Sequence, residues 1–115
     1  PPRRVTLAEI DLGFLPPGGR ETEIIEIAND KAKVLTVDRW QASCECVTIE
    51  PAATVIPGAG KALLRITADF AYDPSYAGGL RVRIAGISAK REPLVEFDAR
   101  LRVLTQTEYE SAFGK

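Results

Sequence analysis

The sequence predicts an all-β sandwich of about seven short strands, and two observations lead to this fold class. Turn residues recur at short intervals, and most runs between them alternate apolar and polar side chains with the period of two typical of half-buried strands. No segment shows a convincing helical period. With 115 residues, 45% of them hydrophobic, the chain can form one domain with a real core. We expect that domain to span 1–104, with 105–115 as a polar C-terminal tail or linker.

The first half of the chain is predicted to contain three strands, at residues 5–12, 21–29 and 35–42, followed by two short extended pieces at 47–50 and 53–56. Gly13 is expected to close the first strand, and Ile25 and Ile27 are expected to share one face of the second. In the third strand Trp40 falls out of the apolar phase. A bulge at 38–39 is therefore expected to return its ring to the core, where a lone tryptophan usually serves as an anchor.

Three further strands are predicted in the second half, at residues 61–71, 80–85 and 94–104. The first and last of them show the clearest alternation in the sequence. Their expected inward-facing residues are Leu64, Ile66, Ala68 and Phe70 in one, and Val95, Phe97, Ala99, Leu101 and Val103 in the other. Because these apolar residues recur at every second position, both strands are predicted to line the core.

Composition excludes several classes of function. Basic and acidic residues number 15 and 16, so the net charge of -1 gives no general attraction to nucleic acid or anionic lipid. Histidine and methionine are absent, which excludes Ser-His-Asp and Cys-His catalysis, histidine-ligated zinc, and copper held by thioether or imidazole. No run of 18 apolar residues occurs, so we expect no direct membrane insertion. We expect no cofactor, and the opening Pro1-Pro2 predicts a chain cut from a longer protein.

Both cysteines lie in one motif, SCECVT at 43–48. In an extended strand the Cα atoms of residues i and i+2 lie about 6.5–7 Å apart, and disulfides prefer roughly 4.4–6.8 Å. A bond between Cys44 and Cys46 therefore requires a kinked backbone. The carboxylate of Glu45 disfavours a neighbouring thiolate. Three interpretations stay open: packing of two small hydrophobes, which leads; a disulfide, structural or redox-active; and a metal site such as Cu(I).

Two arginines alternate in the strand at 80–85 and are predicted to form charge pairs. If the loop between Gly86 and Pro93 centres a hairpin, Arg83 falls near Glu96 and Arg81 near Asp98, and both form cross-strand charge pairs. Each such pair contributes only about 0.2–1 kcal/mol. We therefore expect a solvated ladder of charges rather than a cationic binding site.

A partner-binding surface is predicted from two other groups of residues. Arg100 and Arg102 share a strand face beyond the expected charge pairs, and they form the candidate patch for an anionic partner. Tyr72 and Tyr76 lie in a loop long enough to carry recognition, at an end of the sandwich where such domains bind partners. We expect the partner to be a protein or a neighbouring domain of the same chain.

Six short motifs follow one another in a recognisable order and spacing. They are Asp11-Leu12-Gly13, Gly18, Ile25-x-Ile27-x-Asn29, Leu35-x-Val37, Ser43-Cys44-Glu45-Cys46-Val47-Thr48 and Pro57-Gly58. Over roughly 5–104 this pattern resembles a bacterial domain-of-unknown-function family of Ig-like modules with a Ser-Cys-Gly-Cys-Thr signature, found mostly in secreted proteins and lipoproteins. Glu45 stands where that family has glycine. The resemblance implies a seven-stranded Ig-like sandwich similar to Hydin-like and major-sperm-protein-like modules.

The resemblance also implies an interaction or scaffold role without catalytic residues. It implies an extracytoplasmic setting: periplasmic, cell-surface or secreted. We therefore expect a non-enzymatic, Ig-like interaction or structural module of a larger exported bacterial protein. The alternative is a thiol redox or Cu(I)-binding module that uses Cys44 and Cys46.

Overall fold

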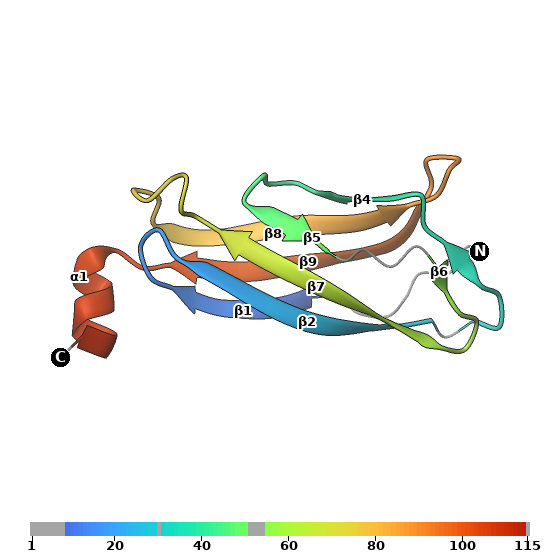
Figure 1. Cartoon of the computed structure of the whole chain (residues 1–115), viewed down its shortest axis with the longest axis horizontal. Helices are drawn as coiled ribbons and strands as arrows, with labels where there is room; N and C mark the ends of the chain where they lie inside the picture. The colour runs from blue at the N-terminus through green and yellow to red at the C-terminus, as the bar shows by residue number, and fades with distance from the viewer. Residues whose placement is uncertain (1–8, 30, 51–54, 115) are drawn as a thin grey trace.

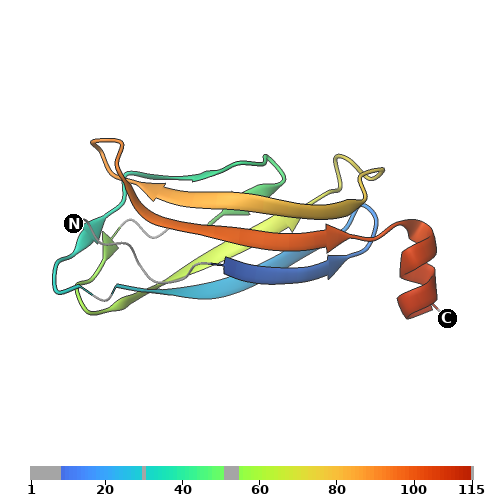
Figure 2. The same cartoon turned by 180° about the vertical axis from the view of Figure 1, so that it is seen from behind.

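Nine strands form three sheets within residues 9–29, 31–50 and 55–114, the parts of the chain that the computed structural model describes (Figure 1). The strands are β1 (Glu9–Leu15), β2 (Arg20–Ala28), β3 (Leu35–Thr36), β4 (Arg39–Ala42), β5 (Val47–Ile49), β6 (Val55–Ile56), β7 (Lys61–Asp69), β8 (Gly78–Ile87) and β9 (Pro93–Val103). One sheet has the order β1-β9-β8-β4, a second the order β2-β7-β5, and β3 pairs with β6. The two larger sheets face each other (Figures 1 and 2), so the predicted β-sandwich is confirmed.

The core lies between β7 of the three-stranded sheet and β8 and β9 of the four-stranded sheet. Every inward-facing residue predicted for β7 and β9 is buried, and β8 adds Val82 and Ile84. Leu63, next to the buried Leu64, is instead 61% exposed, as expected for a strand with one solvated face. Each fully buried large side chain contributes about 1.5–3 kcal/mol to stability. The alternation read from the sequence is therefore confirmed in both long strands.

β2 runs antiparallel to β7 along its whole length. Ile27 is buried and Ile25 packs against the core, so their predicted orientation is confirmed. Ile24 precedes them in sequence and projects from the outer face, 61% exposed. Together with Leu63 of β7, it leaves apolar surface on the outside of this sheet.

Asn29 follows β2 and is the buried polar anchor of the next turn. Its side-chain Nδ2 group donates hydrogen bonds to the carbonyl oxygens of Lys33 (2.9 Å), Pro57 (3.1 Å) and Ile56 (3.4 Å). Its Oδ1 atom accepts the backbone N–H of Lys31 at 3.0 Å. One amide therefore joins the turn after β2 to the end of β6, and its burial is compatible with stability because its polar atoms are paired.

The first strand differs from the prediction at its C-terminal end. β1 continues past Gly13 to Leu15 and pairs in parallel with β9, with a register shift between Asp11 and Gly13. Gly13 has φ of 81°, which glycine adopts readily, and its N–H donates to Asp11 Oδ1 at 2.8 Å. The glycine therefore makes a bulge instead of ending the strand. The predicted start at 5–8 lies outside the described residues.

The single strand predicted at 35–42 is wrong, because the structure has two strands there. β3 pairs with β6, whereas β4 pairs with β8 in the four-stranded sheet. The backbone changes partner at Val37 and Asp38, where the Asp38 N–H donates to the Ile87 carbonyl oxygen at 2.7 Å. Trp40 packs partly buried against the core and lies across from Gly86. A Cβ atom at Gly86 would lie 3.0 Å from the indole, so the missing side chain makes room for the ring.

The C-terminal segment is helical, not the polar tail that the sequence predicted. It forms α1 (Gln106–Tyr109) followed by η1 (Glu110–Gly114), a short π-helix. A capping box starts it: Thr105 Oγ1 accepts the Glu108 N–H at 3.0 Å, and Glu108 Oε1 accepts the Thr105 N–H at 2.9 Å. No helix in the described part of the chain is long and apolar enough to cross a membrane.

Candidate functional site

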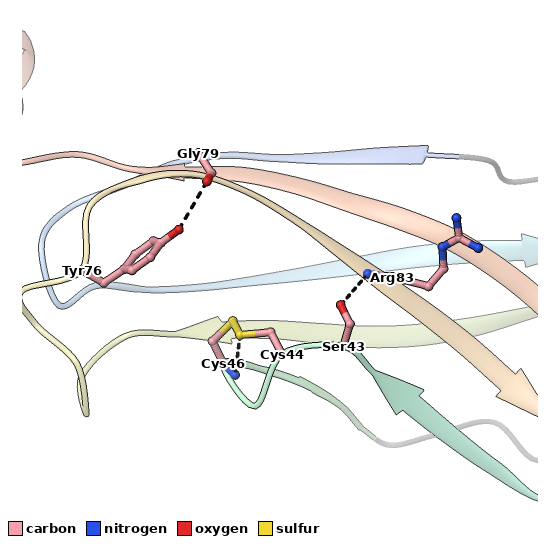
Figure 3. Close-up of a disulfide and its surroundings, with 6 residues drawn as sticks. All are labelled: Ser43, Cys44, Cys46, Tyr76, Gly79 and Arg83. Carbon is pink, nitrogen blue, oxygen red and sulfur yellow. Dashed lines mark hydrogen bonds between the residues drawn. A yellow bond between two sulfur atoms is a disulfide. The ribbon is translucent and has the colours of Figure 1, made fainter.

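The cysteine motif lies where the chain passes from one sheet to the other (Figure 3). β4 ends at Ala42 on the edge of the four-stranded sheet, and β5 begins at Val47 on the edge of the three-stranded sheet. Residues 43–46 make this crossing, and the Val47 N–H donates to the Cys44 carbonyl oxygen at 3.2 Å. That bond closes a tight turn, which supplies the kinked backbone that bonding of the two cysteines requires.

Cys44 and Cys46 are joined by a disulfide bond. Their Cα atoms are 5.1 Å apart, closer than an extended strand allows, because both belong to the tight turn. The leading expectation, two free cysteines packed as small hydrophobes, is therefore wrong. Glu45 does not have a positive φ, so glutamate is accommodated at this position of the turn without backbone strain.

Backbone hydrogen bonds fix the crossing at both ends. Ser43 donates its N–H to the Arg83 carbonyl oxygen (3.0 Å), and its Oγ accepts the Arg83 N–H at 2.9 Å (Figure 3). At the other end, the Asp69 N–H donates to the Cys46 carbonyl oxygen at 2.8 Å. The disulfide thus lies in a turn tied to β8 on one side and to β7 on the other.

The two sulfur atoms differ in their surroundings. Cys46 is 1% exposed and belongs to the core, whereas Cys44 is partly exposed. The Cys46 N–H donates to Cys44 Sγ at 3.1 Å (Figure 3). A bonded pair offers no thiolate to a metal. Within the described residues, no group of three or more His, Cys, Asp or Glu side chains could hold a metal ion.

The arginine ladder on the outer face of the four-stranded sheet has a different register from the one predicted. Arg83 lies opposite Asp98, and Arg81 lies opposite Arg100. The expected charge pairs of Arg83 with Glu96 and of Arg81 with Asp98 do form, at 3.8 and 3.5 Å, but each joins residues that lie diagonally across the two strands. The last paired residues at the hairpin end are Ile87 and Pro93 instead of Gly86 and Pro93, and the register shift next to Gly86 moves the pairing by one more residue.

Ion pairs nevertheless connect the ladder, several of them diagonally. The contacts are Arg83–Asp98 at 2.7 Å, Arg83–Glu96 at 3.8 Å, Arg81–Asp98 at 3.5 Å, Arg81–Glu9 at 3.6 Å, Arg100–Glu9 at 2.8 Å, Arg100–Asp11 at 3.6 Å and Arg102–Glu108 at 3.2 Å. The hydrogen bond from Arg83 lowers the pKa of Asp98. The backbone N–H of Thr105, and then Arg102, lower the pKa of Glu108.

Arg81 and Arg100 lie opposite each other, and both contact the Glu9 carboxylate. This shared carboxylate relieves the charge repulsion between the two arginines.

The residues predicted for partner binding lie at one end of the sandwich, but they differ in accessibility. Arg100 and Arg102 are about half exposed, and each has a carboxylate partner. Tyr72 is 64% exposed, whereas Tyr76 stacks on Phe70, with ring centroids 5.3 Å apart, and donates its hydroxyl to the Gly79 carbonyl oxygen at 3.3 Å (Figure 3). Of the two tyrosines, Tyr72 is thus the one presented to solvent, and Tyr76 anchors the loop.

Sequence reasoning missed Phe14, which is 63% exposed on β1 beside Arg102. The predicted first strand closes at Gly13, so the prediction leaves Phe14 outside any strand. The spacing Asp11-x-Gly13 was the available signal, since an aspartate side chain often caps a backbone N–H two residues later and supports a turn or bulge.

Comparison with known proteins places the fold. No protein-family model matches the sequence, and no curated protein matches it significantly. Among solved structures, a protein of unknown function from Porphyromonas gingivalis W83 is similar over 84% of this chain and 44% of its own, with 25% identity and a TM-score of 0.63. The C. elegans MSP family member WR4 is similar over 79% of this chain and 90% of its own, with 15% identity and a TM-score of 0.50. The periplasmic chaperone SfaE is similar over 89% of this chain and 57% of its own, with 16% identity and a TM-score of 0.52.

These similarities bear on the fold that the sequence predicted. They confirm an Ig-like β-sandwich of the kind found in MSP domains and in a periplasmic chaperone. The chain spans less than half the length of the Porphyromonas protein and little more than half that of the chaperone. Membership in the Ser-Cys-Gly-Cys-Thr family stays a prediction.

Proposed function

We propose that this chain is a non-enzymatic, Ig-like interaction module of a larger exported bacterial protein. In this proposal it works in an oxidising, extracytoplasmic compartment and binds a protein partner or a neighbouring domain. The observation that carries the proposal is the disulfide between Cys44 and Cys46. Such bonds persist outside the cytoplasm and are rare inside it, where thiol reductants keep cysteines reduced.

The surface chemistry supports a binding role over a catalytic one. Among the described residues, the carboxyl groups whose pKa departs from its ordinary value are Asp98 and Glu108, and both pKa values are shifted downward. A general acid working near neutral pH needs the opposite shift, toward a higher pKa. Both carboxylates accept hydrogen bonds from arginine, Asp98 from Arg83 and Glu108 from Arg102, and so serve as structural ion pairs.

The compartment can be tested by measuring the cysteines in the protein from its native host. Cells are fractionated in the presence of an alkylating reagent, and the intact mass of the protein is measured in each fraction. We expect the protein outside the cytoplasm, two hydrogens lighter than the reduced chain and without alkyl groups. Two alkylated thiols in a cytoplasmic protein would contradict the proposal.

A thiol redox function is the second candidate, and the asymmetry of the disulfide favours it. Cys44 is partly exposed, so an external thiolate can attack that sulfur, forming a mixed disulfide with Cys44 and releasing the Cys46 thiolate. A second external thiolate then attacks the mixed disulfide and releases the Cys44 thiolate, which the Cys46 N–H contact would stabilise. Equilibration with glutathione buffers separates the two functions: a bond that stays oxidised over the whole physiological range supports the interaction module alone.

A further inference from the structure

A hollow opens on the outer face of the four-stranded sheet, at the end where β1 and β9 finish. These two strands end side by side, next to the C-terminal helix (Figure 2). It has a volume of about 530 Å³. The lining residues that matter here are Gly13, Phe14, Gly79, Arg81, Arg100 and Arg102. They come from three adjacent strands, β1, β9 and β8, so the floor of the hollow is a hydrogen-bonded sheet.

The hollow exists because two outward positions have no side chain. Gly79 of β8 lies opposite Arg102 of β9, and a Cβ atom added to Gly79 would meet no atom within 4 Å. The same is true of Gly13, in the bulge of β1. Gly79 does not have a left-handed φ, so its backbone does not require glycine. The space above Gly79 is thus open, although the backbone conformation at this position would also accept a residue with a side chain.

The charge around this space favours an anion. The hollow is lined by three arginines and one carboxylate, Asp11. Arg81 lies two residues along the strand from Gly79 and Arg102 directly across from it, so both long side chains can reach a group above Gly79. The Arg81 contacts are 3.5 and 3.6 Å long, beyond the usual 2.7–2.9 Å for charge-assisted hydrogen bonds. Its side chain is 62% exposed, so its N–H donors remain accessible to a second carboxylate.

Phe14 stands between this hollow and a second one. The second hollow has a volume of about 440 Å³ and is formed by Phe14, Leu104 and the C-terminal helix residues Thr107 and Ala112, among others. Its lining is mostly apolar. In an extended chain, side chains two residues apart project to the same side about 6.6 Å from each other. One segment crossing Phe14 could therefore place a carboxylate in the first hollow and an apolar group in the second.

We propose that these two hollows bind an extended segment of a partner protein that presents an acidic side chain and, two residues away, an apolar one. The carboxylate binds above Gly79 between Arg81 and Arg102, and the apolar side chain packs on Phe14. This inference rests on the proposed function as an interaction module and specifies the partner's chemistry. Because the partner's carboxylate would be held by the exposed side chains of Arg81 and Arg102, binding should weaken markedly as salt is raised.

A peptide titration tests the chemistry of the site. The probe is acetyl-Thr-Val-Asp-Val-Leu-Thr-amide, added to the 15N-labelled chain and followed by NMR, with the same peptide carrying Asn for Asp as the control. We expect shifts at the Gly79 and Phe14 amides and at the Arg81 and Arg102 Nε–H groups. The Asp peptide should bind about tenfold more tightly than the Asn peptide. Equal affinities, or shifts confined to other faces, would overturn the proposal.

Variants separate binding from folding. Gly79→Thr fills the open space with a residue that strands accept, so it should abolish the shifts while leaving the melting temperature unchanged. Arg81→Gln should weaken peptide binding about tenfold, whereas Arg65→Gln, at an exposed arginine on the opposite sheet, should leave it unchanged. A folded Gly79→Thr protein that binds as well as the parent would contradict the assignment of the site.

Photo-crosslinking in the full-length protein in its native host distinguishes this inference from the proposed function. Phe14→benzoylphenylalanine places the reactive group between the hollows, and Leu63→benzoylphenylalanine places it on the other sheet. Crosslinks to a protein from Phe14 that disappear with Gly79→Thr support both proposals. Crosslinks from Leu63 alone would overturn this inference and leave the interaction module standing. No crosslink from either position would count against both.

Discussion

Replacing Asn29 with alanine should destabilise the fold strongly, because this buried amide joins the turn after β2 to the end of β6 through several hydrogen bonds. The change removes the donors to the carbonyl oxygens of Lys33, Pro57 and Ile56 and the acceptor for the Lys31 N–H. Each buried polar group left without a partner costs about 1–3 kcal/mol, and water can reach part of this turn. We therefore expect a loss of about 2–4 kcal/mol in the free energy of unfolding.

The expected shift in melting temperature follows from the size of the chain. At about 2.1 cal/mol/K per residue, the unfolding entropy is about 240 cal/mol/K, so the melting temperature should fall by about 8–17 °C. Urea unfolding followed by circular dichroism gives the free energy. Gln41→Ala, which removes an exposed amide from β4, is the matched control and should change stability by less than about 0.5 kcal/mol. A loss for Asn29→Ala no larger than that of the control would refute the reasoning.

Asn29→Asp gives a sharper version of the same test. The shape is nearly unchanged, but an ionised carboxylate would face the carbonyl oxygens of Lys33 and Pro57. Those oxygens disfavour the charged form and raise the pKa of the new carboxyl above its unfolded value. The variant's stability relative to the parent is therefore greatest below the unfolded pKa and is lost as pH rises through the folded pKa. Urea midpoints measured between about pH 4 and 7 should diverge with increasing pH.

Three further outcomes are expected. Leu64→Ala should lower the free energy of unfolding by about 2–5 kcal/mol, whereas Leu63→Ala should change it by less than about 0.5 kcal/mol; similar losses in urea unfolding would contradict the burial pattern. The pKa of Asp98, measured by carboxyl-carbon NMR, should lie below its ordinary value and rise in Arg83→Ala. The stability from this pair is present above the unfolded pKa and disappears as pH falls through the folded pKa; an unchanged titration would remove Arg83 as the cause. Reducing the disulfide, whose cysteines are two residues apart, should cost only about 1.5 kcal/mol in urea unfolding, and a cost near about 4 kcal/mol would mean that it does more than close a short loop.

The long strands could be predicted because one signal dominated them. In β7 and β9 the apolar residues recur at every second position, and burial follows that period. Strand switching at Val37 and Asp38 could not be predicted in the same way. It depends on which distant strand each half meets, β6 or β8, and no glycine or proline marks the break.

The candidate site was predicted only in outline. Register on the arginine face depends both on where the hairpin is centred and on the register shift next to Gly86, which together place Arg83 opposite Asp98 instead of Glu96. The disulfide depends on a turn closed by Val47, without which the cysteines would be too far apart. A local signature of the C-terminal helix was present, since Thr105 and Glu108 have the capping-box spacing. The run after it lacks an apolar stripe, and so the sequence favoured a tail.

The parallel pairing of β1 with β9 determines how the module would respond to mechanical tension. β1 and β9 lie side by side and point the same way, paired from Glu9↔Asp98 to Leu15↔Val103 with one register shift between Asp11 and Gly13. A pull on the chain before β1 and after β9 therefore acts on opposite ends of neighbouring strands. The force runs along both strands, and all the hydrogen bonds of the ladder are strained together, whereas an antiparallel hairpin pulled at its open end separates one pair at a time. When force is applied through the two ends of the domain, we therefore expect this sandwich to resist unfolding instead of extending gradually.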